Sequence, residues 1–236
     1  MTVTLPLSSG GEYTLQPSKI IALGLNYLDH IKESQSVDVS KFTEEIPREP
    51  VLFAKTPNVL IGPGQEIILP AFVEHYGFAN CRTDHEAELA LIIRDRIKDL
   101  PAAQAMSHIL GFTCFNDISQ RNLQKEDKAG WFRGKSLDTF GPIGPVIVTP
   151  ADIGDPQDLA ISCRLNGRLV QDANTRQMIF SIPEIIAFVS KNFTLEAGDI
   201  IITGTPSGVG PLRDGDTVDV TIENIGTLSN PVRTEQ

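Results

Sequence analysis

The sequence predicts a β-rich α+β fold made of short strands, many turns and a few short helices. Two observations support this fold class. The 236 residues include 19 glycines and 16 prolines, the residues that most often mark turns. Short apolar, β-branched runs lie between these turns, as expected of strands, whereas only about three segments have helical character. With 41% hydrophobic residues, the chain is able to bury a substantial core.

The first half of the chain alternates short strands with polar segments. Residues 19–24 predict a buried strand, and residues 26–33 predict a loop or a short helix. The polar, acid-rich residues 34–49 predict a surface loop. Further strands are expected from the apolar runs at residues 51–55, 66–69, 83–93 and 109–118.

Helix signals occur in three segments. Residues 101–108 begin with a proline, which suits the first turn of a helix. Residues 119–128 predict a polar helix capped by Ser119 or Asp117. The sequence Ser181-Ile182-Pro183-Glu184 is a capping box, and the apolar residues after it predict a helix with one packing face.

The C-terminal part returns to strands. Asn166-Gly167 lies between apolar residues and predicts a hairpin with a type I′ turn. Residues 199–232 read as strands joined by glycine-rich turns. No repeat or long linker divides the chain.

Composition limits the partners that this protein can have. The net charge of −10 argues against nucleic acid, whose phosphates require a basic surface. No apolar run reaches transmembrane length and the N-terminus does not resemble a signal peptide, so no membrane association is expected. The cysteines at positions 81, 114 and 163 match no zinc pattern and predict buried free thiols. We therefore expect a cytoplasmic protein.

Two glutamates interrupt an otherwise apolar strand pattern and indicate a metal site. Glu86 and Glu88 point to the same face of a strand over residues 83–93 because side chains alternate. Their repulsion and lost hydration require compensation, and hard oxygen ligands favour Mg²⁺, Mn²⁺ or Ca²⁺ over zinc. Asp117, at the end of another apolar run, supplies a third carboxylate. The alternative is that all three are ordinary acids on half-exposed strands.

Further residues have the character of catalytic groups. His30 and Glu33 are spaced i, i+3, so on a helical turn the carboxylate would support the imidazole as a general base. Lys135 lies between a glycine and a proline-containing turn, where its charge would stabilise an enolate or a carboxylate. A solvated helix face and an ordinary loop lysine remain the alternatives for these two features.

Substrate contacts are expected from three other segments. Gly204 and Thr205 open a glycine-rich loop after an apolar strand, and this loop lets backbone amides approach a ligand. Arg121 and Gln124 would share one face of the helix after Asp117 and reach a substrate carboxylate. Lys55, at the end of the strand at residues 51–55, is a weaker candidate.

Taken in order, these motifs resemble the fumarylacetoacetate hydrolase family in its short, single-domain form. The resemblance extends over nearly the whole chain, and it is carried by Asn26-Tyr27-x-x-His30-x-x-Glu33, Glu86-x-Glu88, Asp117, Gly134-Lys135-Ser136 and Gly204-Thr205-Pro206-Ser207-Gly208. It implies a mixed β-sandwich roll, with residues 1–18 as an N-terminal strand segment packed on a single catalytic domain at residues 19–236. It also implies a homodimer.

The resemblance implies a chemistry as well. Glu86, Glu88 and Asp117 would bind Mg²⁺ or Mn²⁺, with Ca²⁺ as a substitute, and the substrate would be a small-molecule 2-oxo acid. The expected reaction is hydrolysis of a carbon–carbon bond in an acylpyruvate, with His30 and Glu33 activating water and Lys135 stabilising charge. Decarboxylation or isomerisation of 2-oxo diacids from aromatic ring cleavage is the alternative, and a non-catalytic metal-binding protein is a second one. One departure is His85, where the family usually has tyrosine.

Overall fold

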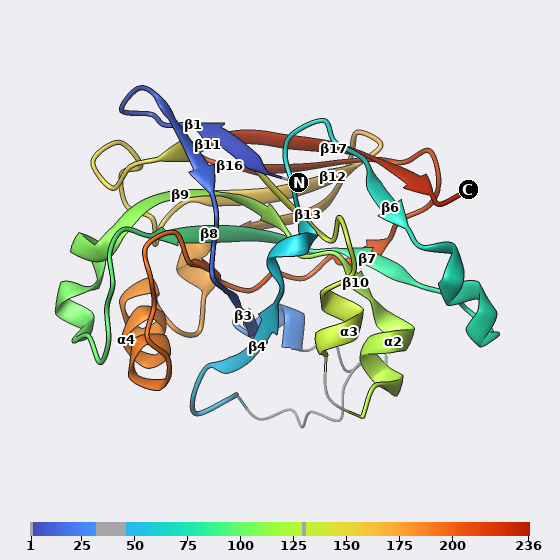
Figure 1. The fold of residues 1–236 in the computed structure, drawn as a ribbon, viewed down its shortest axis with the longest axis horizontal. Helices are drawn as coiled ribbons and strands as arrows, with labels where there is room; N and C mark the ends of the chain where they lie inside the picture. The colour runs from blue at the N-terminus through green and yellow to red at the C-terminus, as the bar shows by residue number, and fades with distance from the viewer. Residues whose placement is uncertain (1, 32–45, 129–130) are drawn as a thin grey trace.

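The computed structural model describes residues 2–31, 46–128 and 131–236, and Figure 1 shows two large sheets with short helices around them. The larger sheet has seven strands and is mixed, with two parallel pairs, β3 with β14 and β5 with β11. In spatial order its strands are β4 (Val51–Lys55), β3 (Ile20–Gly24), β14 (Ile200–Ile202), β8 (Ala87–Ile93), β9 (Ile109–Asn116), β11 (Gly141–Val148) and β5 (Leu60–Ile61).

The second sheet has five strands and packs on the first. Its strands are β13 (Arg168–Asn174), β12 (Ala160–Leu165), β16 (Thr217–Ile222), β17 (Gly226–Thr234) and β6 (Ile67–Leu69). Strands β12 and β16 contact β8, and β16 and β17 contact β9, so the core lies between the sheets. Every residue of β8 is buried, and all of its residues except Glu88 are apolar.

Local sequence signals explain several of these elements. Leu165 pairs with Arg168 across Asn166-Gly167, both with positive φ, so the predicted hairpin is confirmed. The predicted capping box starts α4 (Ile182–Asn192), whose apolar face joins the core. Residues 28–31 are helical, as expected for the segment after β3.

Two predicted helices are wrong in detail. Residues 102–108 form the 3₁₀ helix η3 (Ala102–His108) and not an α-helix. The polar helix α2 (Arg121–Glu126) is shorter than predicted, and its N-cap is Gln120, whose side chain accepts a hydrogen bond from the Leu123 backbone. Ser119 and Gln120 instead form β10, because they pair with the strand that precedes Glu86. The other helices are α3 (Phe132–Lys135), η1 (Pro57–Val59), η2 (Ala71–Tyr76) and η4 (Thr175–Gln177).

The strand predicted at residues 83–93 is divided into two at Glu86. Strand β7 (Thr83–His85) belongs to a three-stranded sheet with β10 (Ser119–Gln120) and β15 (Gly210–Pro211), whereas β8 belongs to the large sheet. The break places Glu86 at the corner between two sheets. Asn116 stabilises this corner, since its Oδ1 accepts a hydrogen bond of 2.9 Å from the Glu86 backbone.

The chain begins with a hairpin of β1 (Val3–Pro6) and β2 (Glu12–Leu15) that packs against β11. Its residues Val3, Leu5 and Leu15 lie in the core. Cys114 and Cys163 are buried free thiols, but Cys81 is exposed, so the expectation of three buried thiols is wrong there. No helix in the described ranges is both long and apolar enough to cross a membrane.

Candidate metal centre and active site

Three carboxylates meet at the corner between the sheets. Glu86 lies in the break before β8, Glu88 lies on β8, and Asp117 follows β9, which pairs with β8. Each offers one oxygen atom, and these oxygens all lie within 4.8 Å of one another. Their exposed fractions are 4%, 1% and 0%, so the alternative of ordinary acids on half-exposed strands is wrong.

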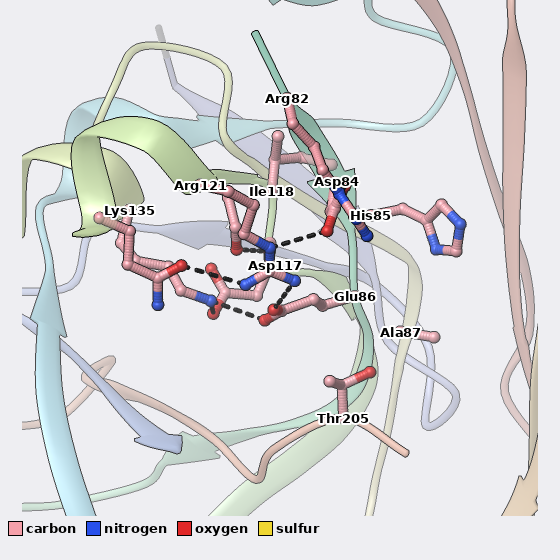
Figure 2. A network of polar contacts seen from close by, with 12 residues as sticks. Arg82, Asp84, His85, Glu86, Ala87, Asp117, Ile118, Arg121, Lys135 and Thr205 are labelled. Atoms are coloured by element: carbon pink, nitrogen blue, oxygen red, sulfur yellow. Dashed lines mark hydrogen bonds and ion pairs between the residues drawn. The ribbon is translucent and has the colours of Figure 1, made fainter. Parts of the chain in front are cut away.

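Three cationic side chains, Lys135, Lys55 and Arg121, form ion pairs with this acid cluster. Figure 2 shows Lys135 and Arg121 beside Glu86 and Asp117. The Lys135 Nζ atom lies 2.6 Å from Glu86 Oε2 and 2.6 Å from Asp117 Oδ2. The Lys55 Nζ atom lies 2.5 Å from Asp117 Oδ1. Both lysines are buried, so these ion pairs lie in an environment that screens them weakly. The alternative that Lys135 is an ordinary lysine in a loop is therefore wrong.

Arg121 connects the cluster to a further carboxylate. Its Nη2 lies 2.6 Å from Glu86 Oε1, and its Nε donates to Asp84 Oδ2 at 2.7 Å. Its Nη1 donates to Gln124 Oε1 at 3.1 Å. The structure thus brings Arg121 and Gln124 together as predicted from helix spacing, but it directs the guanidinium towards protein carboxylates.

Charge compensation is uneven among the three acids. Burial alone would raise the pKa of Glu86, but Lys135 and Arg121 outweigh this effect and hold that pKa below its usual range. Burial raises the pKa of Glu88 well above its usual range, and the negative charges of Asp117 and Glu86 add to this shift. Among the described residues Glu88 forms no ion pair, although its Oε2 accepts a hydrogen bond of 2.7 Å from the Gly204 backbone. Glu88 is therefore the least compensated of the three acids.

This donor set fits a divalent cation. The three acids are close, buried and offer only hard oxygen atoms, and the lysines and Arg121 neutralise Glu86 and Asp117 more than Glu88. A cation beside Glu88 would offset the burial and the repulsion from Asp117 and Glu86 that together raise its pKa. Magnesium and manganese, which bind a few carboxylates and retain open positions, match this set.

A small cavity adjoins the cluster and contains most of the predicted catalytic groups. It encloses about 30 Å³, and its walls include Glu86, Glu88, His30, Lys135 and Thr205. Gln124 also lines it, together with the aromatic side chains of Phe53 and Trp131, whose rings meet edge to face. Glu33, the predicted partner of His30, lies outside the described residues.

Gly204 explains how the loop after β14 reaches this cavity. Its φ of +91° is unfavourable for residues with a side chain, and a Cβ there would lie 2.9 Å from the Asn26 Cβ. The Asn26 side chain in turn donates to the Thr203 backbone and accepts from the Phe180 backbone, both at 2.8 Å. The loop and the segment before His30 are thus packed together at the cavity.

Sequence reasoning missed two buried polar residues near the site. Asp84 is fully buried and pairs with Arg121; its alternation with Glu86 and Glu88 in the sequence was a usable signal. Gln171 donates to Thr205 and accepts from the Ala87 backbone between the two glutamates. It had no local signal, because β13 is distant from both segments in the sequence.

His85 has a different environment from the acids that follow it in the chain. Figure 2 shows its ring pointing away from the cluster, and its Nδ1 lies 3.3 Å from Gln171 Oε1. Burial lowers the pKa of His85, so the ring is neutral at neutral pH. The residue that departs from the family pattern therefore lies behind the site and not in it.

Comparisons with known proteins agree with this architecture. Residues 19–233 match the family described as fumarylacetoacetate (FAA) hydrolase C-terminal. The human protein named oxaloacetate tautomerase FAHD2A, mitochondrial, is 38% identical over 98% of this chain and 73% of its own length.

Solved structures of enzymes share the fold. A 5-carboxymethyl-2-hydroxymuconate delta-isomerase from Mycobacterium smegmatis is 38% identical, with a TM-score of 0.81 over 96% of this chain and 86% of that one. A fumarylpyruvate hydrolase from Pseudomonas aeruginosa, in complex with Mn²⁺ and pyruvate, is 28% identical, with a TM-score of 0.86 over 99% of this chain and 97% of that one. The predicted fold class is confirmed, and the chain belongs to the fumarylacetoacetate hydrolase family.

Proposed function

We propose that this protein is a divalent-metal-dependent enzyme that transfers a proton on a 2-oxo acid, as a keto–enol tautomerase or double-bond isomerase. One observation carries the proposal: the buried acids Glu86 and Glu88, the Lys135 ammonium and the His30 imidazole line one cavity, and Asp117 lies within the same acid cluster beside it. This set supplies a cation site, a fixed positive charge and a proton carrier.

The cation would be held by the three carboxylates of the acid cluster. When bound, it supplies Lewis-acid stabilisation of negative charge on the 2-oxo oxygen. Lys135 adds to that stabilisation. Burial would lower its pKa, but Asp117 and Glu86 outweigh this effect and raise the pKa, so the side chain remains an ammonium at neutral pH. Lys135 therefore acts through its charge and not as a base.

His30 is the described residue best suited to move the proton. It is 8% exposed and lines the same cavity as Glu86 and Glu88. A neutral imidazole there would take a proton from carbon 3 of the 2-oxo acid and return it to the oxygen, which conserves the composition of the substrate. In double-bond isomerisation the proton would return to a more distant carbon.

Hydrolysis of an acylpyruvate is the second candidate, and the Mn²⁺- and pyruvate-containing fumarylpyruvate hydrolase supports it. That reaction needs an activated water in addition to the groups named above. The supporting base would be Glu33, which lies outside the described residues. Proton transfer requires no further group, and the relatives at 38% identity are named as a tautomerase and an isomerase, so we place it first.

The test measures tautomerisation and decarboxylation of oxaloacetate and hydrolysis of acetylpyruvate, each in the presence of Mg²⁺, Mn²⁺ or a chelator. Enol-to-keto conversion of oxaloacetate is followed by ultraviolet absorbance, with metal but no protein as the blank, and products from oxaloacetate and acetylpyruvate are identified. Metal-dependent tautomerisation without carbon dioxide supports the first candidate. Pyruvate plus acetate from acetylpyruvate replaces it with hydrolysis, and carbon dioxide from oxaloacetate replaces it with decarboxylation.

His30→Ala tests the proton carrier. We expect kcat to fall by about 10²- to 10⁴-fold, as for loss of a general base, while Mn²⁺ affinity stays unchanged. His75→Ala is the matched control because His75 is exposed on η2. Equal turnover by the His30 and His75 variants would reject the assignment.

A further inference from the structure

Gln171 joins three parts of the site from the second sheet. It lies on β13, is 1% exposed, and makes four contacts through its side-chain amide. Its Oε1 accepts from the Ala87 backbone at 3.0 Å and lies 3.3 Å from His85 Nδ1. Its Nε2 donates to Thr205 Oγ1 at 2.8 Å and to the Pro206 carbonyl at 2.9 Å.

These contacts determine which way the amide faces. A glutamine amide offers two acceptor positions on oxygen and two hydrogens on nitrogen, and all four are used here. The Ala87 N–H can only donate and the Pro206 carbonyl can only accept. A flipped amide would face both with the wrong atom, and a buried mismatch of this kind is costly. The same orientation requires His85 to carry a hydrogen on Nδ1.

The orientation of Gln171 determines the role of the Thr205 hydroxyl. Because the Gln171 nitrogen can only donate, Thr205 Oγ1 is an acceptor in that contact. This is the one hydrogen bond of Thr205 Oγ1 within the described ranges. The hydroxyl hydrogen therefore remains to be donated, and Thr205 lines the cavity beside Glu88 and His30.

The loop that contains Thr205 packs directly against β13, the strand that contains Gln171. A Cβ on Gly208 would lie 2.0 Å from the Val170 carbonyl oxygen, so the loop backbone approaches the residue before Gln171 very closely. The Gly208 φ of +99° also requires glycine. Gln171 thus holds the loop at Thr205 and Pro206, next to Gly204, whose backbone N–H donates to Glu88.

We propose that Gln171 is a positioning residue that commits the Thr205 hydroxyl to donate a hydrogen bond to the bound substrate. The acceptor would be an anionic oxygen, a carboxylate or an enolate, of the 2-oxo acid. The inference rests on the proposed function, because it assumes that an anionic ligand occupies the cavity. It assigns Gln171 no contact with the substrate.

The experiment measures binding of oxalate, an analogue of a planar 2-oxo acid enolate, to the Mn²⁺-loaded protein by calorimetry. Mn²⁺ affinity is measured separately by electron paramagnetic resonance. Gln171→Met removes the donor, and Gln171→Glu replaces it with an acceptor. We expect roughly tenfold weaker oxalate binding for each variant, the effect of one lost hydrogen bond to a charged group, with unchanged Mn²⁺ affinity.

Thr205 variants test the connection between the two residues. Thr205→Val should weaken oxalate binding to a similar extent, whereas Thr205→Ser should retain it. In the double variant Gln171→Met with Thr205→Val, the loss should equal that of Thr205→Val alone, because Gln171 acts only through the Thr205 hydroxyl, which the valine has already removed. Additive losses would overturn the proposal.

Asn230→Asp is the control for a change in a buried amide. Asn230 lies on β17 in the same sheet, is 1% exposed, and donates to two backbone carbonyls away from the site. This variant should lower thermal stability without changing oxalate affinity. If Gln171→Met and Gln171→Glu bind oxalate as tightly as the wild-type protein does, the inference is rejected. Absence of Mn²⁺ or oxalate binding by the wild-type protein would reject the proposed function instead.

Discussion

Lys55 and Asp117 form a fully buried ion pair, with Nζ 2.5 Å from Oδ1. Lys55 also donates to the backbone carbonyl of Lys135, which connects β4 to α3. Lys55 is the last residue of β4 and pairs with Ile20 of β3. Lys55, a weaker candidate from the sequence, is therefore part of the electrostatic balance of the site.

Replacing Lys55 should destabilise the metal-free protein strongly. Lys55→Met leaves the buried Asp117 carboxylate without one of its two cations, and removing one partner of a buried pair costs about 3–5 kcal/mol. Urea denaturation in the presence of chelator measures this loss, and Mn²⁺ should restore part of it. Lys19→Met is the control, since Lys19 pairs with Asp199 nearer the surface. An equal loss in both variants would contradict the role of burial.

Replacing Glu88 should have opposite effects with and without metal. The raised pKa of Glu88 means that its charged form destabilises the folded state at neutral pH, so Glu88→Gln should stabilise the metal-free protein by about 1 kcal/mol or more. A chain of this size should then melt about 2–4 °C higher in chelator. The same variant should lose most of the stabilisation that Mn²⁺ gives to the wild-type protein.

Thermal unfolding in chelator and in Mn²⁺ measures both effects of Glu88→Gln. Glu223→Gln is the control, because Glu223 is exposed and lies outside the cluster. A lower melting temperature in chelator, or an undiminished Mn²⁺ response, would argue that Glu88 is not a ligand.

Replacing Gly134 should displace Lys135. A Cβ on Gly134 would lie 2.7 Å from both the Gln120 carbonyl oxygen and the Gln124 nitrogen, which are backbone atoms that cannot move independently. Gly134→Ala should therefore separate α2 from α3 and cost about 1–3 kcal/mol. Turnover should fall as well, because Lys135 follows directly. At Gly62 a Cβ meets only ordinary contacts, so Gly62→Ala should preserve stability and turnover; matching losses in the two variants would refute the steric argument.

Asp199 should make the free energy of unfolding decrease at acidic pH. Burial would raise its pKa, but hydrogen bonds from the Glu196 backbone, Lys19 and Ser18 outweigh this and lower it. An acid whose folded pKa is depressed stabilises the protein above its unfolded pKa, about 3.9, and loses that contribution as pH falls through the lower folded value. The free energy of unfolding of wild type minus Asp199→Asn should therefore be positive at pH 6 and shrink below about pH 4. A difference independent of pH would contradict the argument.

Much of the secondary structure followed from local signals. The Asn166-Gly167 turn and the Ser181 capping box depend on backbone preferences of a few adjacent residues, so they were predictable. The error at Ser119 and Gln120 has a non-local cause. Their polar residues suit a helix, but pairing with β7 holds them as a strand.

The candidate site was predictable only in part. Alternation along a strand indicated that Glu86 and Glu88 share a face, and the structure adds that the strand breaks between its two sheets at Glu86. No local pattern indicated that Lys55, Arg121 and Lys135 compensate these acids, because each lies on a different element. Electrostatic compensation is a matter of distance in space, which spacing along the chain does not reveal.

The sequence alone was enough to predict the fold class, the turns and the choice of Glu86, Glu88 and Asp117 as candidate metal ligands. These features depend on local backbone preference and on the presence of charge in apolar segments. Packing of the two sheets was needed to bury the acids, to leave Glu88 the least compensated, and to bring Gln171 from β13 against Thr205. These properties depend on desolvation and on contacts between distant segments. They arise only when the chain is folded.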